Sequence, residues 1–348
     1  MKPSNQRRVV ALPYLMMAVV AALDLLSGPE VGFLPLVALG PAFASLAGGV
    51  RRTVLIGLVA LLLCVLLSTY NNVLGTTRGF TSLASVLGVT AAGMVAAAGR
   101  QRREKELADV RSIAEVAQRV LLRPVPRRAG HLRAAVSYTS AVAEARIGGD
   151  LYEVVTAPGG ARVIVGDVQG KGLEAVETAA VVLGAFREAA HDEADLAGVS
   201  SRLEKALNRH LSGEEFVTAV LAEINPDRTV TLLNYGHPAP LLVRADGSAL
   251  FVEPAEPVPP LGLASLGPEG PVSHRVTLAP GDQMLLYTDG VTEARDRRGR
   301  FYPLADRVSL LREDDPEAAL EALRRDLVTH VDGPLHDDAA MLLLRYLG

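Results

Sequence analysis

The sequence predicts an α+β protein in two parts, an apolar helical region followed by a polar region of short strands and helices. Residues 1–99 contain only eight Lys, Arg, Asp and Glu, whereas the other 249 residues contain 66. From about residue 131 the apolar residues fall into short runs separated by turn residues, which is typical of strands. Helical segments are expected among these strands at residues 173–190, 195–211 and 316–330.

The N-terminal region contains four charge-free apolar runs, at residues 9–23, 31–50, 53–77 and 79–99. A helix needs roughly 20 residues to cross a bilayer, and the first run reaches that length only by including Asp24. A cleavable signal peptide is the alternative for the first run, but three further apolar runs follow it closely. We therefore expect a four-span transmembrane region over residues 1–99.

The positions of basic residues predict the orientation of these spans, because Lys and Arg of short loops are retained in the cytoplasm. Basic residues precede the first run, lie between the second and third, and cluster after the fourth: Arg51, Arg52, Arg100, Arg102, Arg103 and Lys105. We expect a multi-pass protein of the cell membrane with the C-terminal region in the cytoplasm. Asp24 is either functional, as intramembrane carboxylates usually are, or lies near the outer interface beside Glu30.

A helical connector is predicted at residues 100–126, and Pro124 and Pro126 stop its helix. Its apolar residues recur at spacings of three and four: Leu107, Val110, Ala114, Ala117 and Leu121. This spacing fits a coiled coil that would join two chains as a homodimer, and it fits equally an amphipathic helix packed on its own domain.

Charge and cysteine content exclude several classes of site. The net charge is −4 and no basic patch stands out, which argues against a nucleic-acid partner. The single cysteine, Cys64, lies in an apolar run, so neither a disulfide framework nor a cysteine zinc site is expected. Any metal ion must therefore be held by oxygen or imidazole ligands.

Acidic residues recur beside glycine at the ends of predicted strands of the polar region. The four motifs are Gly148-Gly149-Asp150, Gly166-Asp167-Val168, Thr288-Asp289-Gly290 and His336-Asp337-Asp338. Magnesium and manganese prefer carboxylate oxygens, and the lack of histidine in three of the motifs disfavours zinc. Four acidic groups balance roughly two divalent ions, and such a pair can activate a water and bind the oxygens of a transferring phosphoryl group.

Signatures of covalent catalysis are missing from the sequence. It contains no Gly-x-Ser-x-Gly elbow, no cysteine–histidine pairing and no P-loop. A single Asp-Gly pair is usually only a turn. The functional interpretation therefore depends on the order of the motifs.

That order includes two more motifs, Phe216-Val217-Thr218 and Asn234-Tyr235-Gly236-His237-Pro238, and the Thr288-Asp289-Gly290 motif lies within a longer one from Leu285 to Glu293. Together the motifs resemble those of the stage II sporulation protein E (SpoIIE) type of metal-dependent serine/threonine phosphatases, which are similar to protein phosphatase 2C. The resemblance covers about residues 130–346, within a domain predicted at 127–348. It implies an α-β-β-α sandwich of two antiparallel sheets flanked by helices, with two Mn²⁺ or Mg²⁺ ions at one end.

The resemblance also implies roles for the acidic residues. Asp167 would bridge the two ions, with the carbonyl of Val168 as a further ligand. Asp289 and Asp337 would complete one ion. Asp338 is the neighbouring choice if the register at Asp337 is shifted by one.

Four other residues matter to the site that the resemblance implies. Asp150 would act at its edge, through water or a weaker ion. Glu153 stands where the family usually has a second Asp, which leaves its role open. Lys171 either binds the substrate phosphate or is a solvated loop residue. His237 matches the family's histidine and is expected to be a packing residue.

The predicted function is that of a membrane-anchored, metal-dependent phosphoserine/phosphothreonine phosphatase, with catalytic roles for Asp150, Asp167, Asp289 and Asp337. A phosphorylated anti-sigma-factor antagonist is the substrate that the resemblance suggests. The alternative is a degenerate domain that binds its partner without catalysis, and Glu153 is the feature that keeps this alternative open.

Overall fold

A computed structural model describes residues 3–27, 32–140, 148–157, 160–211, 215–264, 267 and 272–348. The chain divides into two compact units, Met1–Asp109 and Val110–Gly348. The division falls within one long helix, α4 (Thr77–Leu121).

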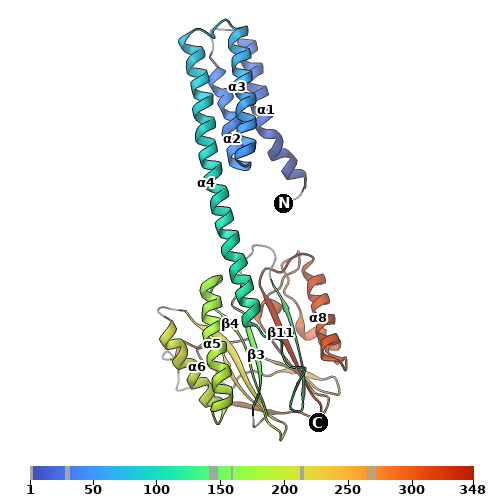
Figure 1. The fold of residues 1–348 in the computed structure, drawn as a ribbon. Coiled ribbons are helices and arrows are strands. Elements are labelled where there is room, and N and C mark those ends of the chain that lie inside the picture. Colours follow the sequence, from blue (N-terminus) through green and yellow to red (C-terminus); the bar gives the residue numbers. More distant parts are fainter. Residues whose placement is uncertain are drawn as a thin grey trace. The chain divides into compact units, whose positions relative to one another are not determined.

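The first unit consists of apolar helices (Figure 1). They are α1 (Pro3–Ser27), the 3-10 helix η1 (Leu34–Ala38), α2 (Leu39–Ala47), α3 (Val50–Tyr70) and the first part of α4. By length and composition, α3 and α4 can cross a membrane, whereas the apolar helices Ala11–Ser27 and Leu34–Leu46 are shorter. Two of the four predicted spans are thus supported by length, and the other two stay predictions.

Asp24 is fully buried in this unit. Its Oδ2 accepts a hydrogen bond of 2.8 Å from Nδ2 of Asn71, the residue that follows α3. Sequence spacing gave no sign of this pair, because the two residues come from different helices.

The connector sequence forms the last turns of α4, which ends at Leu121. Ala114 is buried against Val176 of α5 (Leu173–Asp192), and Ala117 and Leu121 pack beside them. These turns therefore pack on their own domain, one of the two predicted arrangements. Leu107 and Val110 are more than half exposed, and a homodimer through this helix stays a prediction.

The second unit contains two antiparallel sheets. One sheet has the order β1 (Arg128–Ala129), β2 (Leu132–Thr139), β11 (Ala339–Tyr346), β10 (Gln283–Tyr287), β7 (Leu241–Val243) and β8 (Ala249–Phe251). The other has the order β3 (Leu151–Ala157), β4 (Gly160–Val168), β5 (Val217–Ile224), β6 (Thr229–Tyr235) and β9 (His274–Thr277). No strand was predicted at the short β1 and β7, which have two and three residues.

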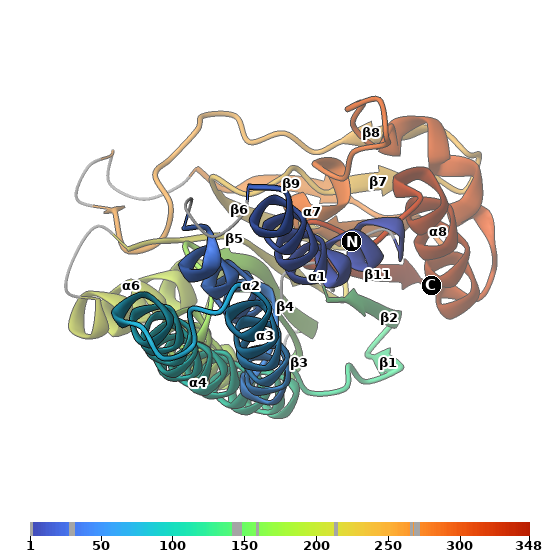
Figure 2. The same cartoon turned by 90° about the horizontal axis from the view of Figure 1, so that it is seen from above.

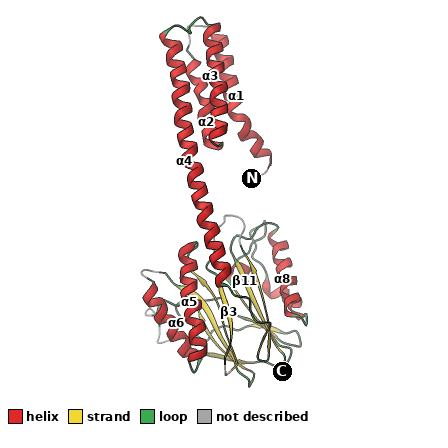
Figure 3. Ribbon diagram, viewed as in Figure 1, coloured by secondary structure: helices red, strands yellow, loops and turns green. Residues whose placement is uncertain are grey.

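Three apolar layers give a sandwich with helices outside, and they follow from side chains alternating between the faces of each strand. Residues of both sheets, such as Val163 and Leu342, form the central layer. α5 and α6 (Leu196–His210) cover the outer face of the β3–β9 sheet, and α8 (Pro316–Val331) covers the other sheet. Figures 2 and 3 show α6 and α8 on opposite sides of the strands. The predicted α+β sandwich and its three helices are confirmed.

Candidate metal centre

Five strands have an end at the same edge of the sandwich. β2, β4 and β10 finish there, whereas β3 and β11 begin there, as the register pairs Thr139–Ala339, Leu151–Gly166 and Tyr287–Met341 require. All four acidic motifs lie at these ends, so the fold brings together residues that are up to 188 positions apart, from Asp150 to Asp338. A short helix, α7 (Asp289–Thr292), follows β10 directly.

The alternation of side chains directs three of the carboxylates into the space between the sheets. Asp167 is in step with the buried Val165 of β4, and Asp338 is in step with the buried Ala340 of β11. Asp150 precedes β3 on the face that β3 turns toward the other sheet, and it is 4 % exposed.

These carboxylates act on one another electrostatically. Burial and then the charges of Asp289 and Asp337 raise the pKa of Asp167 to about 7. Burial and then the charge of Asp167 raise the pKa of Asp150 well above its usual value. The pKa of Asp289 is raised by burial and by Asp337. Like charges this close disfavour the ionised forms, and a divalent cation would relieve their repulsion.

Asp150 is held by the chain itself. Its Oδ2 accepts a hydrogen bond of 2.8 Å from the hydroxyl of Thr288. The same hydroxyl oxygen accepts a bond of 3.0 Å from the backbone N–H of Ala340. Through these two bonds, the fully buried Thr288 links β10 and β11 to Asp150, which precedes β3.

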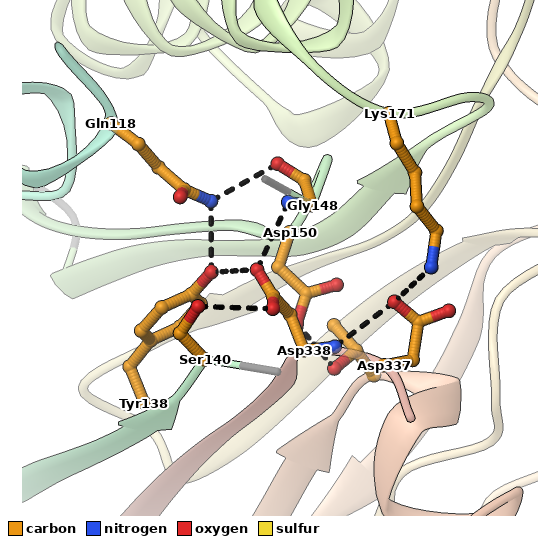
Figure 4. Close-up of polar contacts among 9 residues, drawn as sticks. Gln118, Tyr138, Ser140, Gly148, Asp150, Lys171, Asp337 and Asp338 are labelled. Carbon is orange, nitrogen blue, oxygen red and sulfur yellow. Dashed lines mark hydrogen bonds and ion pairs between the residues drawn. The ribbon is translucent and has the colours of Figure 1, made fainter. Parts of the chain in front are cut away.

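Asp337 and Asp338 occupy different environments (Figure 4). Asp338 is 2 % exposed, and its Oδ2 accepts hydrogen bonds from the Tyr138 hydroxyl and, at 3.1 Å, from the N–H of Gly148. The side chain of Asp337 is 46 % exposed, and its Oδ1 lies 2.6 Å from Nζ of Lys171. Asp337 lies in the bend that precedes β11, whereas Asp338 directly precedes the strand and is in step with the buried Ala340.

Glycines let the acidic segments approach one another. A Cβ at Gly149 would lie 2.5 Å from the carbonyl oxygen of Val168, and one at Gly148 would lie 2.5 Å from Oδ2 of Asp338. A Cβ at Gly290 would lie 1.8 Å from the carbonyl oxygen of Asp338. Each of these glycines therefore permits a backbone approach that a side chain would block.

The side chains of Asp150, Asp337 and Asp338 are bonded to protein donors. Within the described parts of the chain, no three His, Cys, Asp or Glu side chains are arranged to hold an ion. The clustered oxygen donors nevertheless fit a hard divalent cation, because burial and neighbouring carboxylates raise the pKa values of Asp150 and Asp167, and glycines leave room beside them. An ion bound through Oδ1 of Asp337 would take the place of Lys171 at that oxygen.

Comparison with known proteins identifies the family of this chain. The model of the stage II sporulation protein E (SpoIIE) family matches residues 157–347, more than half of the chain. The chain belongs to the SpoIIE family. This match includes three of the four acidic motifs, and the Gly148-Gly149-Asp150 motif precedes it.

Individual proteins similar to this SpoIIE-family chain match between 58% and 70% of its length. The phosphoserine phosphatase RsbU of Bacillus subtilis is 25% identical over 205 residues, which are 58% of this chain and 60% of RsbU. The SiaA-PP2C domain of Pseudomonas aeruginosa has a similar fold, with a TM-score of 0.58 at 21% identity, over 70% of this chain and 98% of that domain. The SpoIIE phosphatase domain structure from Bacillus subtilis gives a TM-score of 0.53 at 16% identity, over 62% of this chain and 63% of that one.

Glu153 does not belong to the acidic cluster. It is on the face of β3 that packs against α5, and its Oε2 lies 2.5 Å from Nε of Arg187 on that helix. A second guanidinium nitrogen of Arg187 donates to the carbonyl of Leu121, the last residue of α4, at 2.8 Å. Glu153 therefore has a structural role in this SpoIIE-family chain.

His237 connects the two sheets and does not face the carboxylates. Its Nε2 lies 3.1 Å from the carbonyl oxygen of Tyr287 in β10, and its Nδ1 lies 3.0 Å from the hydroxyl of Thr218 in β5. Burial lowers the pKa of His237 to about 4, so the ring is neutral at pH 7. This arrangement agrees with the packing role expected from the sequence.

Sequence reasoning missed two polar residues around the carboxylates, Gln118 and Tyr138. The position of one of them, Tyr138, could have been predicted from the sequence. Tyr138 is in step with the apolar residues Leu132, Ala134 and Val136 of β2, which assigns it to the inner face at the strand end.

We predict that Gly149→Ala weakens Mn²⁺ binding by more than about tenfold, because the new methyl group would displace the Val168 carbonyl. Isothermal titration calorimetry checks this. The matched control is Gly184→Ala on the exposed side of α5, where nothing lies within 4 Å of the new Cβ. Equal Mn²⁺ affinity in the two variants would contradict the prediction.

Proposed function

We propose that this SpoIIE-family chain is a metal-dependent protein serine/threonine phosphatase. The observation that carries the proposal is the convergence of Asp167, Asp289 and Asp337 at one edge of the sandwich, where burial and the charge of Asp337 raise the pKa values of Asp167 and Asp289. RsbU, a relative that matches 58% of this chain, is a phosphoserine phosphatase. The chain spans about 60% of the length of RsbU, so the activity is inferred for the shared region.

The proposed ligands are those of the acidic cluster. Asp167, Asp289, Asp337 and the carbonyl of Val168 would hold two Mn²⁺ or Mg²⁺ ions, with Asp150 and Asp338 at the edge. Such ions supply an activated water and Lewis-acid stabilisation of phosphoryl oxygens. The chain itself holds Asp150 through Thr288 and orients Asp338 through Tyr138 and Gly148.

A catalytically degenerate binding domain is the competing function. Its support was the replacement of a family Asp by Glu153. Because Glu153 pairs with Arg187 away from the cluster, the replacement leaves the proposed ligands intact.

We predict that Asp167→Asn and Asp289→Asn each lower Mn²⁺-dependent phosphatase turnover at least roughly 100-fold, because each removes a charged ligand. Turnover is measured by phosphate release from a phosphoserine protein, and Mn²⁺ binding by calorimetry. Asp306→Asn, an exposed residue of the 3-10 helix η3 (Leu304–Arg312), is the control. Wild-type turnover in either cluster variant would refute the site, and a wild-type chain without Mn²⁺ binding would favour the degenerate domain.

The substrate is proposed to be a phosphorylated anti-sigma-factor antagonist, with Lys171 binding its phosphate. Lys171 is at the rim of the cluster, since it contacts the half-exposed Asp337. We predict that Lys171→Ala raises KM for such a phosphoprotein about tenfold, the loss of one charge-assisted contact, with a smaller change in kcat. Lys205→Ala, an exposed lysine of α6, is the control. An unchanged KM together with tighter Mn²⁺ binding would show that Lys171 only competes with the ion for Asp337.

We also propose that the first unit anchors the chain in the cell membrane through four spans, with both termini in the cytoplasm. α3 and α4 have sufficient length and apolar character for this role. In a Cys64→Ser background, we predict that Thr76→Cys reacts with a membrane-impermeant maleimide in intact cells, whereas Ser112→Cys reacts only after permeabilisation. Labelling of both sites in intact cells, or of neither, would contradict this topology.

A further inference from the structure

The last turns of α4 extend a side chain to the candidate metal centre. Gln118 is 8 % exposed, and its Nε2 donates hydrogen bonds to the Tyr138 hydroxyl at 2.8 Å and to the Gly148 carbonyl at 3.1 Å (Figure 4). A buried amide that makes two bonds of this kind restricts the positions of both acceptors.

The two residues that accept these bonds also donate hydrogen bonds to one and the same carboxylate oxygen. The Tyr138 hydroxyl and the Gly148 N–H each donate to Oδ2 of Asp338. Because the Tyr138 oxygen accepts from Gln118, its single proton is directed to Asp338. The amide of Gln118 therefore acts on Asp338 along two short hydrogen-bonded routes.

The helix end that carries Gln118 is fixed to the domain. The carbonyl of Leu121 accepts a bond from Arg187, whose guanidinium pairs with the buried Glu153. One turn before Gln118, the buried Ala114 packs against Val176. The place of Gln118 is thus set by how the last turns of α4 sit on β3 and α5.

We propose that Gln118 is a positioning residue of the metal centre, which orients Asp338 through Tyr138 and holds the Gly148-Gly149-Asp150 segment through the Gly148 carbonyl. This inference rests on the proposed function, because it assigns Asp338 and Asp150 to the metal site. Through the hydrogen bonds of Gln118, the end of α4 acts on two of the four acidic motifs. A shift of the last turns of α4 therefore alters metal affinity.

Calorimetric Mn²⁺ titration of the full chain in detergent tests this inference, with four forms: wild type, Gln118→Met, Tyr138→Phe and the double variant. Gln118→Met keeps the side-chain size but removes the donors. We expect each single variant to bind Mn²⁺ about tenfold more weakly, as for residues that orient metal ligands. The combined loss in the double variant should be smaller than the sum of the two single losses in free energy, because both changes interrupt the route through Tyr138. Ser112→Ala, on an exposed part of α4, should bind as wild type does.

Four outcomes would overturn the inference. Wild-type affinity in Gln118→Met would do so while leaving the proposed function intact, and so would additive losses in the double variant. If Gln118→Met does not fold, as judged by its melting curve without Mn²⁺, wild-type affinity in Tyr138→Phe alone would overturn the route to Asp338. A wild-type chain that binds no Mn²⁺ would overturn the proposed function and this inference together.

Discussion

The burial of several carboxylates at one edge of a sheet sandwich is the constraint on which the rest of the structure depends. Removing a carboxylate from water is costly unless it is paired or hydrogen-bonded. Asp150 accepts a hydrogen bond from Thr288, Asp338 from Tyr138 and Gly148, and Asp337 faces Lys171. Burial, and then the repulsion between neighbouring carboxylates, raises the pKa values of Asp150, Asp167 and Asp289. A site of this kind is prepared for positive charge.

The antiparallel register keeps these groups together. Each sheet contributes strands whose inner faces are packed by apolar side chains up to the last residues, where a carboxylate or a hydroxyl replaces them. A shift of one residue in any of these strands would turn its polar side chain to the opposite face and break the cluster. The apolar core between the sheets therefore also fixes the geometry of the polar edge.

The end of α4 belongs structurally to this edge. Gln118 bonds to Tyr138 and Gly148 beside the carboxylates, and Arg187 connects Leu121 to Glu153 of β3. The substitution at Glu153 therefore concerns how the helix is attached and not how a cation is held. The same contacts give the helix end a physical connection to Asp338.

The sequence by itself determined the contrast between the apolar and polar regions, most strands and helices of the second unit, and the acidic residues at strand ends. These are local properties, readable from periodicity, charge and the order of motifs. Only the tertiary structure decided that Asp338 is buried while Asp337 is half-exposed, that Glu153 faces α5, and that Gln118 and Tyr138 belong to the site. Those features depend on the residue at which each strand begins. They also depend on contacts between residues that are far apart in the sequence, such as Tyr138 and Asp338, which are 200 positions apart. Sequence periodicity carries no information about such long-range contacts, because they are set by how the sheets and helices pack.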